Sequence, residues 1–322
     1  MGTELNKSLS ICIPTYNGEI KLRENLMHLL PIVSKHNLPI CISDNASTDG
    51  TEQTVKEFQE RYPYIFYDKN QSNEGYDRNC YKVLRMSKTQ YAWLVGNDDL
   101  IVEATLNDVL IAVYGDQEYI LINVNTNVGE GKRVPVGDTV FYDYNEWMLK
   151  IGSHLTHMSG IIFNGKIFEH EDAARYYDTD FLHLCLAYNG AVKSGLSVKW
   201  ISATGTILAQ TAKNETSKRA FYLFVLQIYK CIKLFNKIYS KRAKKHFIET
   251  HFAYLNGLYF ILFMRECGQV NLFKYLGHLK AIHYMLSFKM RWALFISCFL
   301  PKRFLHFLRI TRRKIINRGE KV

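Results

Sequence analysis

The chain has 322 residues, of which 48% are hydrophobic and 22% are charged, so a sizeable buried core is expected and a low-complexity chain is excluded. Its formal net charge of +11 is divided very unevenly along the sequence. Residues 1–210 contain 18 Lys and Arg against 26 Asp and Glu, whereas residues 211–322 contain 23 against 4. This asymmetry predicts two modules, the second of which faces an anionic partner.

The seven cysteines are scattered along the chain and never form a C-x-x-C pair. That pattern is typical of a reduced cytosolic protein in which buried thiols act as small apolar residues. Residues 1–9 are polar and carry an acid, so we expect no signal peptide. Nor does any apolar run reach the length of about 18 residues that a membrane span requires. The sequence therefore predicts a cytoplasmic protein.

Short apolar runs alternate with segments of helical spacing through the first 115 residues. This spacing predicts strands at 9–13, 39–43, 65–67 and 91–95, and helices at 19–30, 51–62, 76–86 and 100–113. Strands that alternate with helices at this interval are typical of an α/β fold, in which a mostly parallel sheet carries helices on both faces.

The next segment is less regular. We expect strands at 119–124, 160–163, 199–203 and 206–210, a loop at 125–138, and helices at 144–151, 166–176 and from 178 to 188. The last third predicts helices at 220–239, 252–264 and 276–300, followed by a segment dense in Arg and Lys at 302–321. Bulky apolar faces flanked by basic residues are typical of helices that lie on a membrane surface. The alternative is a helical bundle with a solvated basic face.

Polar loops follow three of the predicted strands, at Tyr16, at Asp44 and at the adjacent pair Asp98 and Asp99. Because the carboxyl ends of parallel strands open on one edge of a sheet, these loops should form one crevice. Adjacent carboxylates repel each other and lose hydration there, a cost that a divalent metal bound with a diphosphate would offset. The alternative is that Asp98 and Asp99 cap the following helix.

The two common phosphate-binding loops, G-x-x-x-x-G-K and G-x-G-x-x-G, are absent from the sequence. Acidic loops do not favour a bare phosphate. They suit hydrogen bonds to a base and a ribose, together with a metal that carries the phosphates.

Four motifs occur in order, at Ser10–Asn17, Ser43–Thr51, Asn73–Asn79 and Gly96–Asp99. Through them the first third of the chain resembles the inverting glycosyltransferases of family 2, and most closely the abequosyltransferase-like branch that builds bacterial surface polysaccharides. The resemblance fades after about residue 210. It implies a GT-A fold, which is a Rossmann-like mixed, mostly parallel sheet flanked by helices. The charge and spacing of the last third add a basic helical C-terminal extension.

The resemblance also implies a division of labour along the chain. Residues 1–210 would be the GT-A catalytic domain, with nucleotide-sugar binding in about 1–115 and the acceptor side in about 116–210. Residues 211–322 would be the basic helical region that associates with the membrane.

The resemblance assigns roles to individual positions. Residues that bind the nucleotide-sugar would be Pro14, Thr15, Tyr16, Asp44, Asn73, Gly75, Arg78 and Asp98. Within that set, Asp44 would accept from a pyrimidine and Asp98 would bind the ribose, while Asp99 would hold the metal. Asn97 departs from the family pattern, which has an acid there, and this departure bears on metal dependence.

Local alternatives stand beside several of these roles. Asp44 also suits an Asx-turn in a polar loop. Arg78 could pair with Glu74 or Asp77 on its own helix. Separately, we expect three residues of the second motif to cap the following helix rather than bind ligand, namely Thr48, Asp49 and Thr51.

The catalytic base of such an enzyme is a carboxylate that reaches the acceptor hydroxyl. By the resemblance Asp180 matches this position, with Asp178 as the second choice, and helix capping is the alternative for both. His183 lies three residues after Asp180, on the same helix face, and is a second possible metal ligand. His154 and His157 could line the acceptor side.

Together these features predict a metal-dependent glycosyltransferase that uses Mn²⁺ or Mg²⁺. It would move a hexosyl or deoxyhexosyl group from a nucleoside-diphosphate-sugar to a hydroxyl of a glycan or polyprenyl-linked glycan, with inversion. The expected process is assembly of a bacterial O-antigen, capsule or teichoic acid, at the inner face of the cell membrane. An inactive GT-A glycan-binding or scaffold protein at the membrane is the alternative. Nucleic acid is not an expected partner, because no nucleic-acid-binding signature is present.

Overall fold

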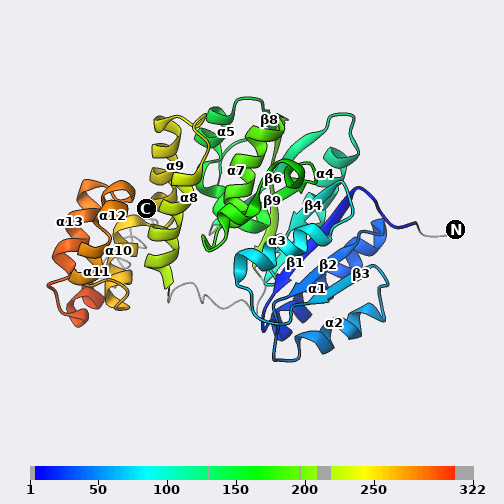
Figure 1. Cartoon of the computed structure of the whole chain (residues 1–322), viewed down its shortest axis with the longest axis horizontal. Coiled ribbons are helices and arrows are strands. Elements are labelled where there is room, and N and C mark those ends of the chain that lie inside the picture. Colours follow the sequence, from blue (N-terminus) through cyan, green and yellow to red (C-terminus); the bar gives the residue numbers. More distant parts are fainter. Residues whose placement is uncertain (1–3, 129–130, 133, 196, 209–218, 309–322) are drawn as a thin grey trace, which may run out of the picture. The chain divides into compact units, whose positions relative to one another are not determined.

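The structure is a computed structural model that describes residues 4–128, 131–132, 134–195, 197–208 and 219–308 (Figure 1). The chain divides into two compact units. The first consists of Met1–Lys213 with Leu234–Ala243, and the second of Asn214–Lys233 with Lys244–Val322.

The first unit is built on a mixed sheet. Its strands are β1 (Leu9–Thr15), β2 (Ile40–Asp44), β3 (Ile65–Lys69), β4 (Tyr91–Leu94), β5 (Asp99–Ile101), β6 (Tyr119–Val128), β7 (Gly131–Lys132), β8 (Thr139–Phe141), β9 (Ile161–Asn164) and β10 (Ser197–Leu208). The order is β3-β2-β1-β4-β9-β6-β10-β5, with β7 beside β6 and β8 beside β10. The four strands from β3 to β4 are parallel, and β9 runs antiparallel to both of its neighbours. The predicted mixed α/β fold is therefore confirmed.

Helices cover this sheet. They are α1 (Glu19–Val33), α2 (Thr51–Gln59), α3 (Tyr76–Met86), α4 (Glu103–Tyr114), α5 (Tyr144–Lys150), α6 (Ile167–His170) and α7 (Leu182–Ser194). Every residue of β1 and β2 is buried, as expected for parallel strands with both faces covered. Of the helices, α3 contacts β1, β2 and α7, and so links the first strands of the chain to a helix about a hundred residues later.

Three of the wrong boundaries lie in or beside the sheet, where strand pairing extends further than the local pattern shows. The helix predicted at 100–113 begins at Glu103, because the residues just before it form β5 and pair with β10. The loop predicted at 125–138 begins as the end of β6, where the Asn125 side chain bonds both backbone groups of Val134. The two predicted closing strands are one long strand, β10, with register shifts.

The second unit is helical. It contains α9 (Lys241–Tyr254), α10 (Gly257–Glu266), α11 (Leu272–Gly277), α12 (Leu279–Met285) and α13 (Phe288–Ser297), and begins with a π-helical segment, η6 (Tyr222–Gln227), that leads into α8 (Ile228–Leu234). The helix predicted at 276–300 is broken, because Ser287 caps α13 by accepting a hydrogen bond from the Met290 amide. None of the described helices has the length and apolar character needed to cross a bilayer. The basic segment predicted at 302–321 lies mostly outside the described residues.

Leu234–Ala243 packs in the first unit although the chain around it belongs to the second. The Tyr239 hydroxyl donates to the carbonyl oxygen of Tyr188 in α7 at 2.7 Å. The Asn236 amide donates to the Asn189 side chain at 2.8 Å, so the segment closes one side of α7.

Candidate active site

The loops after β1, β2 and β4 meet at one rim. Thr15 and Asp44 are register partners at the carboxyl ends of β1 and β2. The Asn45 amide donates to the Thr15 carbonyl oxygen at 2.9 Å, and the Asn97 side chain donates to Thr15 Oγ1 at 3.0 Å. The three loops therefore meet at one edge of the sheet, as the topology predicts, and hydrogen bonds join them.

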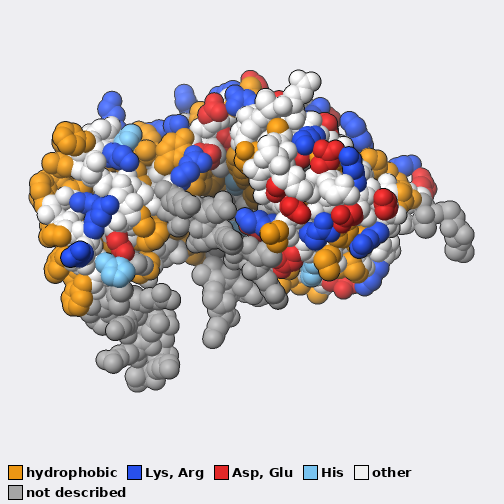
Figure 2. Space-filling view, turned by 90° about the horizontal axis from the view of Figure 1, so that it is seen from below, with side chains coloured by type: hydrophobic (Ala, Val, Ile, Leu, Met, Phe, Trp, Pro, Cys, Tyr) orange, Lys and Arg blue, Asp and Glu red, His pale blue; other side chains and the backbone are white. Residues whose placement is uncertain are grey.

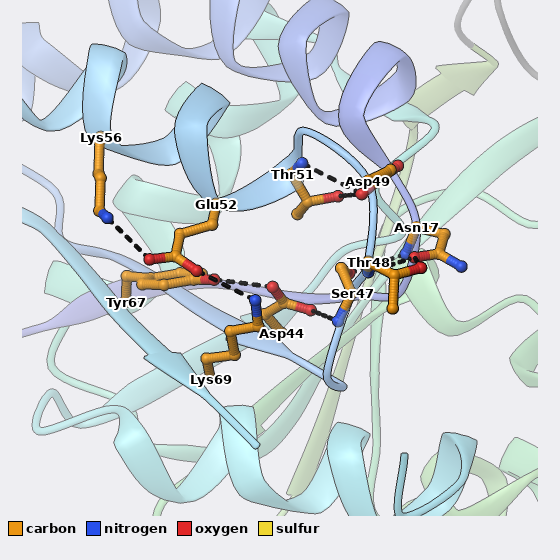
Figure 3. Close-up of polar contacts among 10 residues, drawn as sticks. All are labelled: Asn17, Asp44, Ser47, Thr48, Asp49, Thr51, Glu52, Lys56, Tyr67 and Lys69. Atoms are coloured by element: carbon orange, nitrogen blue, oxygen red, sulfur yellow. Dashed lines mark hydrogen bonds and ion pairs between the residues drawn. The ribbon is translucent and has the colours of Figure 1, made fainter. Parts of the chain in front are cut away.

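Asp44 lies at the base of this rim, 0% exposed (Figure 3). Its Oδ1 accepts from the Ser47 amide at 2.8 Å, and its Oδ2 accepts from the Tyr67 hydroxyl at 2.7 Å. Burial, and then the hydrogen bond to Asp44, raise the pKa of Tyr67. Asp44 therefore bonds the amide three residues on in its own loop, rather than two residues on as in the Asx-turn that was the alternative. Contact with a nucleobase stays a prediction.

The rest of the loop after Asp44 forms hydrogen bonds near the N-termini of two helices (Figure 3). The Asp49 carboxylate accepts from the amides of Thr51 and Glu19, both at 3.1 Å, and so joins the first turns of α2 and α1. The Thr48 amide donates to the Asn17 side chain at 2.9 Å. Of the three residues predicted to cap α2, Asp49 bonds the first amide of that helix, whereas Thr48 bonds the Asn17 loop and the N-cap position is Gly50.

The loop before α3 is held to the same rim by Asn45. Its side-chain nitrogen donates to Asn73 Oδ1 at 2.8 Å, and its oxygen accepts from the Glu74 amide at 2.9 Å. Gly75, at the start of α3, has φ 89° and ψ 165°, a conformation open essentially only to glycine. Of the first motif, Pro14 is buried in β1, while Tyr16 is 49% exposed at the rim.

The two adjacent carboxylates have different surroundings. Asp98 is partly exposed and lies 3.4 Å from the Lys21 ammonium. Asp99 is 6% exposed, and its Oδ2 accepts from the Ser159 hydroxyl at 2.5 Å. Burial raises the pKa of Asp99, against the opposing effects of His157 and Ser159. Since α4 begins only at Glu103, these acids do not cap it.

Among the described residues no cluster of three His, Cys, Asp or Glu is arranged to hold a metal ion by itself. His183 is buried, and its Nε2 lies 3.4 Å from the Thr156 carbonyl oxygen. Burial lowers the pKa of His183 to about 4, so the ring is neutral. Asp98 and Asp99 offer hard oxygen donors, and Mg²⁺ is commonly bound by one or two carboxylates with substrate phosphates supplying the rest. The residues therefore fit a metal whose coordination a diphosphate completes.

The two candidate bases lie in the turn before α7. Asp178 and Asp180 both have left-handed backbone conformations, with φ 63° and 56°. Arg78 pairs with Asp178 at 3.0 Å, and its guanidinium lies 4.6 Å from the centre of the Tyr177 ring. The alternative pairing of Arg78 with acids of its own helix is wrong. Of the two candidates, Asp178 is engaged by this ion pair.

The residue that sequence reasoning missed is Asp77, a buried acid in the third motif. Its carboxylate accepts from the backbone amides of Thr179, Asp180 and Leu182, at 2.8, 2.9 and 3.0 Å. Burial raises the pKa of Asp77 to about 6, although these three hydrogen bonds act in the opposite direction. The only sequence signal was an acid inside a family motif, because its partners lie about a hundred residues later in the chain.

The other two histidines have structural contacts. His154 is fully buried, with Nε2 2.8 Å from the Val124 carbonyl oxygen. His157 Nε2 lies 3.2 Å from Thr206 Oγ1. Of these two, His157 is the one that acts electrostatically on Asp99.

Comparison with known proteins places this geometry in context. The model of the family "Glycosyl transferase family 2" matches residues 10–169. Abequosyltransferase RfbV of Salmonella typhimurium is 27% identical over 258 residues, which are 72% of this chain and 76% of that protein. Poly(ribitol-phosphate) beta-N-acetylglucosaminyltransferase TarP of Staphylococcus aureus is 27% identical over 132 residues, 40% of each chain.

Solved structures share the fold. TarS of Staphylococcus aureus, in complex with UDP-GlcNAc, superposes with a TM-score of 0.52 at 12% identity, over 90% of this chain and 79% of that one. The mannosyltransferase PcManGT of Pyrobaculum calidifontis, in complex with GDP-Man and Mn²⁺, has a TM-score of 0.52 at 15% identity, over 90% and 85%.

Proposed function

Because the chain belongs to glycosyl transferase family 2, whose domain spans residues 10–169, we propose that it transfers a sugar from a nucleoside-diphosphate-sugar to a hydroxyl of a glycan or lipid-linked glycan. The process we propose is assembly of a bacterial surface polysaccharide, as the names of the matched abequosyltransferase and teichoic acid proteins suggest. The observation that carries the proposal is the rim where Thr15, Asn45 and Asn97 join three loops.

The donor would lie across these loops by its nucleotide. Tyr16 is exposed at the rim, where its ring would contact the nucleobase, whereas Asp44 is buried. Asp98 would accept from the ribose. Arg78 is a cation at the first turn of α3, beside the loop that Asn73 and Gly75 build, and would approach the phosphates. In the proposed complex the backbone comes close at Gly75, which has no side chain to obstruct it.

A divalent metal would be held by Asp99, with Asp98 beside it. When bound, such an ion neutralises charge on the departing diphosphate. Burial raises the pKa of Asp99, which means that its charged form lacks full compensation in the protein alone, and a cation would supply it. We assign the metal here rather than to His183, because the His183 ring is buried and its Nε2 already faces the Thr156 carbonyl oxygen.

Asp180 would act as the base. It is half-buried in the turn before α7, whereas the Asp178 side chain is exposed. Its carboxylate would take the proton of the acceptor hydroxyl as that oxygen attacks the anomeric carbon. The bond from that carbon to the diphosphate breaks on the opposite face, and the configuration inverts.

A screen of nucleotide-sugars for hydrolysis and for thermal stabilisation, with and without Mn²⁺, tests this proposal. We expect at least one donor to be hydrolysed slowly without acceptor. Asp99→Ala and Asp180→Ala should each lower transfer by orders of magnitude while the unfolding temperature stays close to that of the parent. A folded chain that neither binds nor hydrolyses any donor would instead favour the inactive glycan-binding alternative.

We further propose that the second unit binds the membrane surface. Phe288, Trp292 and Phe299 follow one another on and just after α13, and each is more than half exposed. Hydrophobic and basic side chains intermingle over this unit, on the left of Figure 2. Apolar rings flanked by cations are the means by which interfacial helices bind anionic leaflets, with roughly 1 kcal/mol from each basic residue.

Sedimentation with vesicles tests this second proposal. The full chain should pellet with vesicles containing phosphatidylglycerol and much less with purely zwitterionic ones. Replacing both Phe288 and Trp292 by Ala should weaken the binding. Exchanging two exposed rings of the first unit, Tyr114 and Tyr142, for Ala is the matched control. Equal binding by both double variants would refute the assignment.

A further inference from the structure

One buried carboxylate connects the two halves of the candidate site. Asp77 stands in the first turn of α3, and its side chain receives three backbone N–H groups from the turn that precedes α7. Its Oδ2 serves the amides of Thr179 and Asp180, and its Oδ1 serves that of Leu182. The helices α3 and α7 are in contact (Figure 1).

The turn that Asp77 holds is strained. Asp178 and Asp180 both take left-handed conformations, which cost free energy for any residue other than glycine. Such a turn persists only where its surroundings fix it. The N-cap residue of α7, Phe181, makes no capping hydrogen bond through its side chain, so the bonds to Asp77 replace a local cap.

Stability alone does not account for this carboxylate. Burial is the largest influence on Asp77 and raises its pKa to about 6, so the carboxylate stays mainly charged at neutral pH but its charge is less favourable in the folded protein than in the unfolded chain. A buried acid that costs stability at working pH is expected to have another role.

We propose that Asp77 is a positioning residue, which sets the turn that carries Asp180 and so aims the Asp180 carboxylate at the acceptor hydroxyl. The inference rests on the proposed function, because it takes Asp180 as the base. Gly75, at the N-terminus of α3, belongs to the proposed donor site. The same helix would therefore fix the distance between the donor and the catalytic base Asp180.

The first test separates turnover from binding. Asp77→Ala should lower kcat by about 10- to 100-fold, as is common for groups that orient a reacting residue, and change the donor KM by less than about threefold. Asp77→Asn should lie between Ala and the parent. Its single carbonyl oxygen can still serve the amides of Thr179 and Asp180, while its NH₂ group faces the Leu182 amide.

A matched control is Asp143→Ala. Asp143 also caps a helix of the first unit, accepting from the Glu146 amide at 2.7 Å at the start of α5. This variant should leave kcat unchanged. An equal loss of kcat in both variants, or loss of folding in both Asp77 variants, would mean a merely structural role and overturn the inference.

A double-mutant cycle with Asp180→Asn completes the test. If Asp77 acts through Asp180, adding Asp77→Ala to Asp180→Asn should lower the residual kcat by no more than about twofold. Full additivity would overturn the positioning role and leave the transferase proposal intact. Normal turnover in Asp180→Asn alone would remove the base assignment, and with it this inference. Absence of donor turnover in the parent chain would overturn the proposed function itself.

Discussion

Gly75→Ala tests the conformation of the loop before α3, which contains Asn73 and Gly75. The φ of 89° and ψ of 165° at Gly75 lie in a region that is essentially closed to other residues. A Cβ added there would meet nothing within 4 Å, so Gly75→Ala isolates the backbone cost from any steric clash. We expect the free energy of unfolding to fall by about 1–3 kcal/mol, the usual cost of such a conformation.

Two further glycines calibrate that value. A Cβ at Gly195 or at Gly137 would also meet nothing within 4 Å. Gly195 has φ 66° and ψ 8° and ends α7, so Gly195→Ala should cost about 1 kcal/mol, as for single left-handed residues. Gly137 has no left-handed φ, and Gly137→Ala should stay within about 0.5 kcal/mol of the parent. Destabilisation is therefore expected to be smallest for Gly137→Ala, larger for Gly195→Ala and largest for Gly75→Ala.

Urea unfolding with linear extrapolation measures the three differences. Gly75→Ala should in addition raise the donor KM, because the Gly75 amide bonds Asn73 at 2.9 Å and its carbonyl oxygen accepts from Asn45 at 3.2 Å. A Gly75→Ala protein as stable as Gly137→Ala would show that the loop does not hold this conformation, and the reasoning would fail.

Further outcomes follow from single contacts. Tyr67→Phe removes a half-buried donor to the buried Asp44 and should cost about 1–3 kcal/mol of unfolding free energy, visible in thermal melts, and an unchanged melt would contradict it. Ser159→Ala removes the donor to Asp99 and should lower donor turnover at least tenfold, whereas parental turnover would show that this contact is dispensable. The pKa of His183 is about 4 in the folded state against 6.5 ordinarily, so the unfolded chain binds more protons between these values. Stability is therefore full above pH 6.5 and falls toward pH 4, by ~3 kcal/mol, and His183→Gln should flatten that decline in urea midpoints measured across the range. Chelation by EDTA should abolish donor hydrolysis and Mn²⁺ should restore it, and activity that survives EDTA would remove the metal from the proposal.

The first hundred residues could be predicted well because their signals are local. Apolar runs such as Leu9–Ile13 are bounded by turn residues, and parallel order brings the loops after them to one edge. That single rule is sufficient to bring the loops at Tyr16, Asp44 and Asp99 to one rim. The abundance of Asn and Gly in these loops also indicates tight turns, as found at Gly75.

What failed depends on partners distant in sequence. Ile101 reads as the start of a helix, but pairing with Thr206 makes it a strand. Arg78 has acids at helical spacing, yet its partner is Asp178, a hundred residues away. The hydrogen bonds that Asp77 accepts from the turn before α7 are also long-range. Their donors lie more than a hundred residues later in the chain, so a local sequence pattern cannot predict them.

The return of Leu234–Ala243 to the first unit has a practical consequence. The first unit is discontinuous in sequence, so truncating the chain at the start of the basic region would also remove the segment that Tyr239 holds against α7. A homologue could carry a different helical C-terminal region only if it kept the segment Leu234–Ala243 or packed another segment against α7. A minimal enzyme would need a short linker that bypasses residues 214–233, with the chain ending after Ala243.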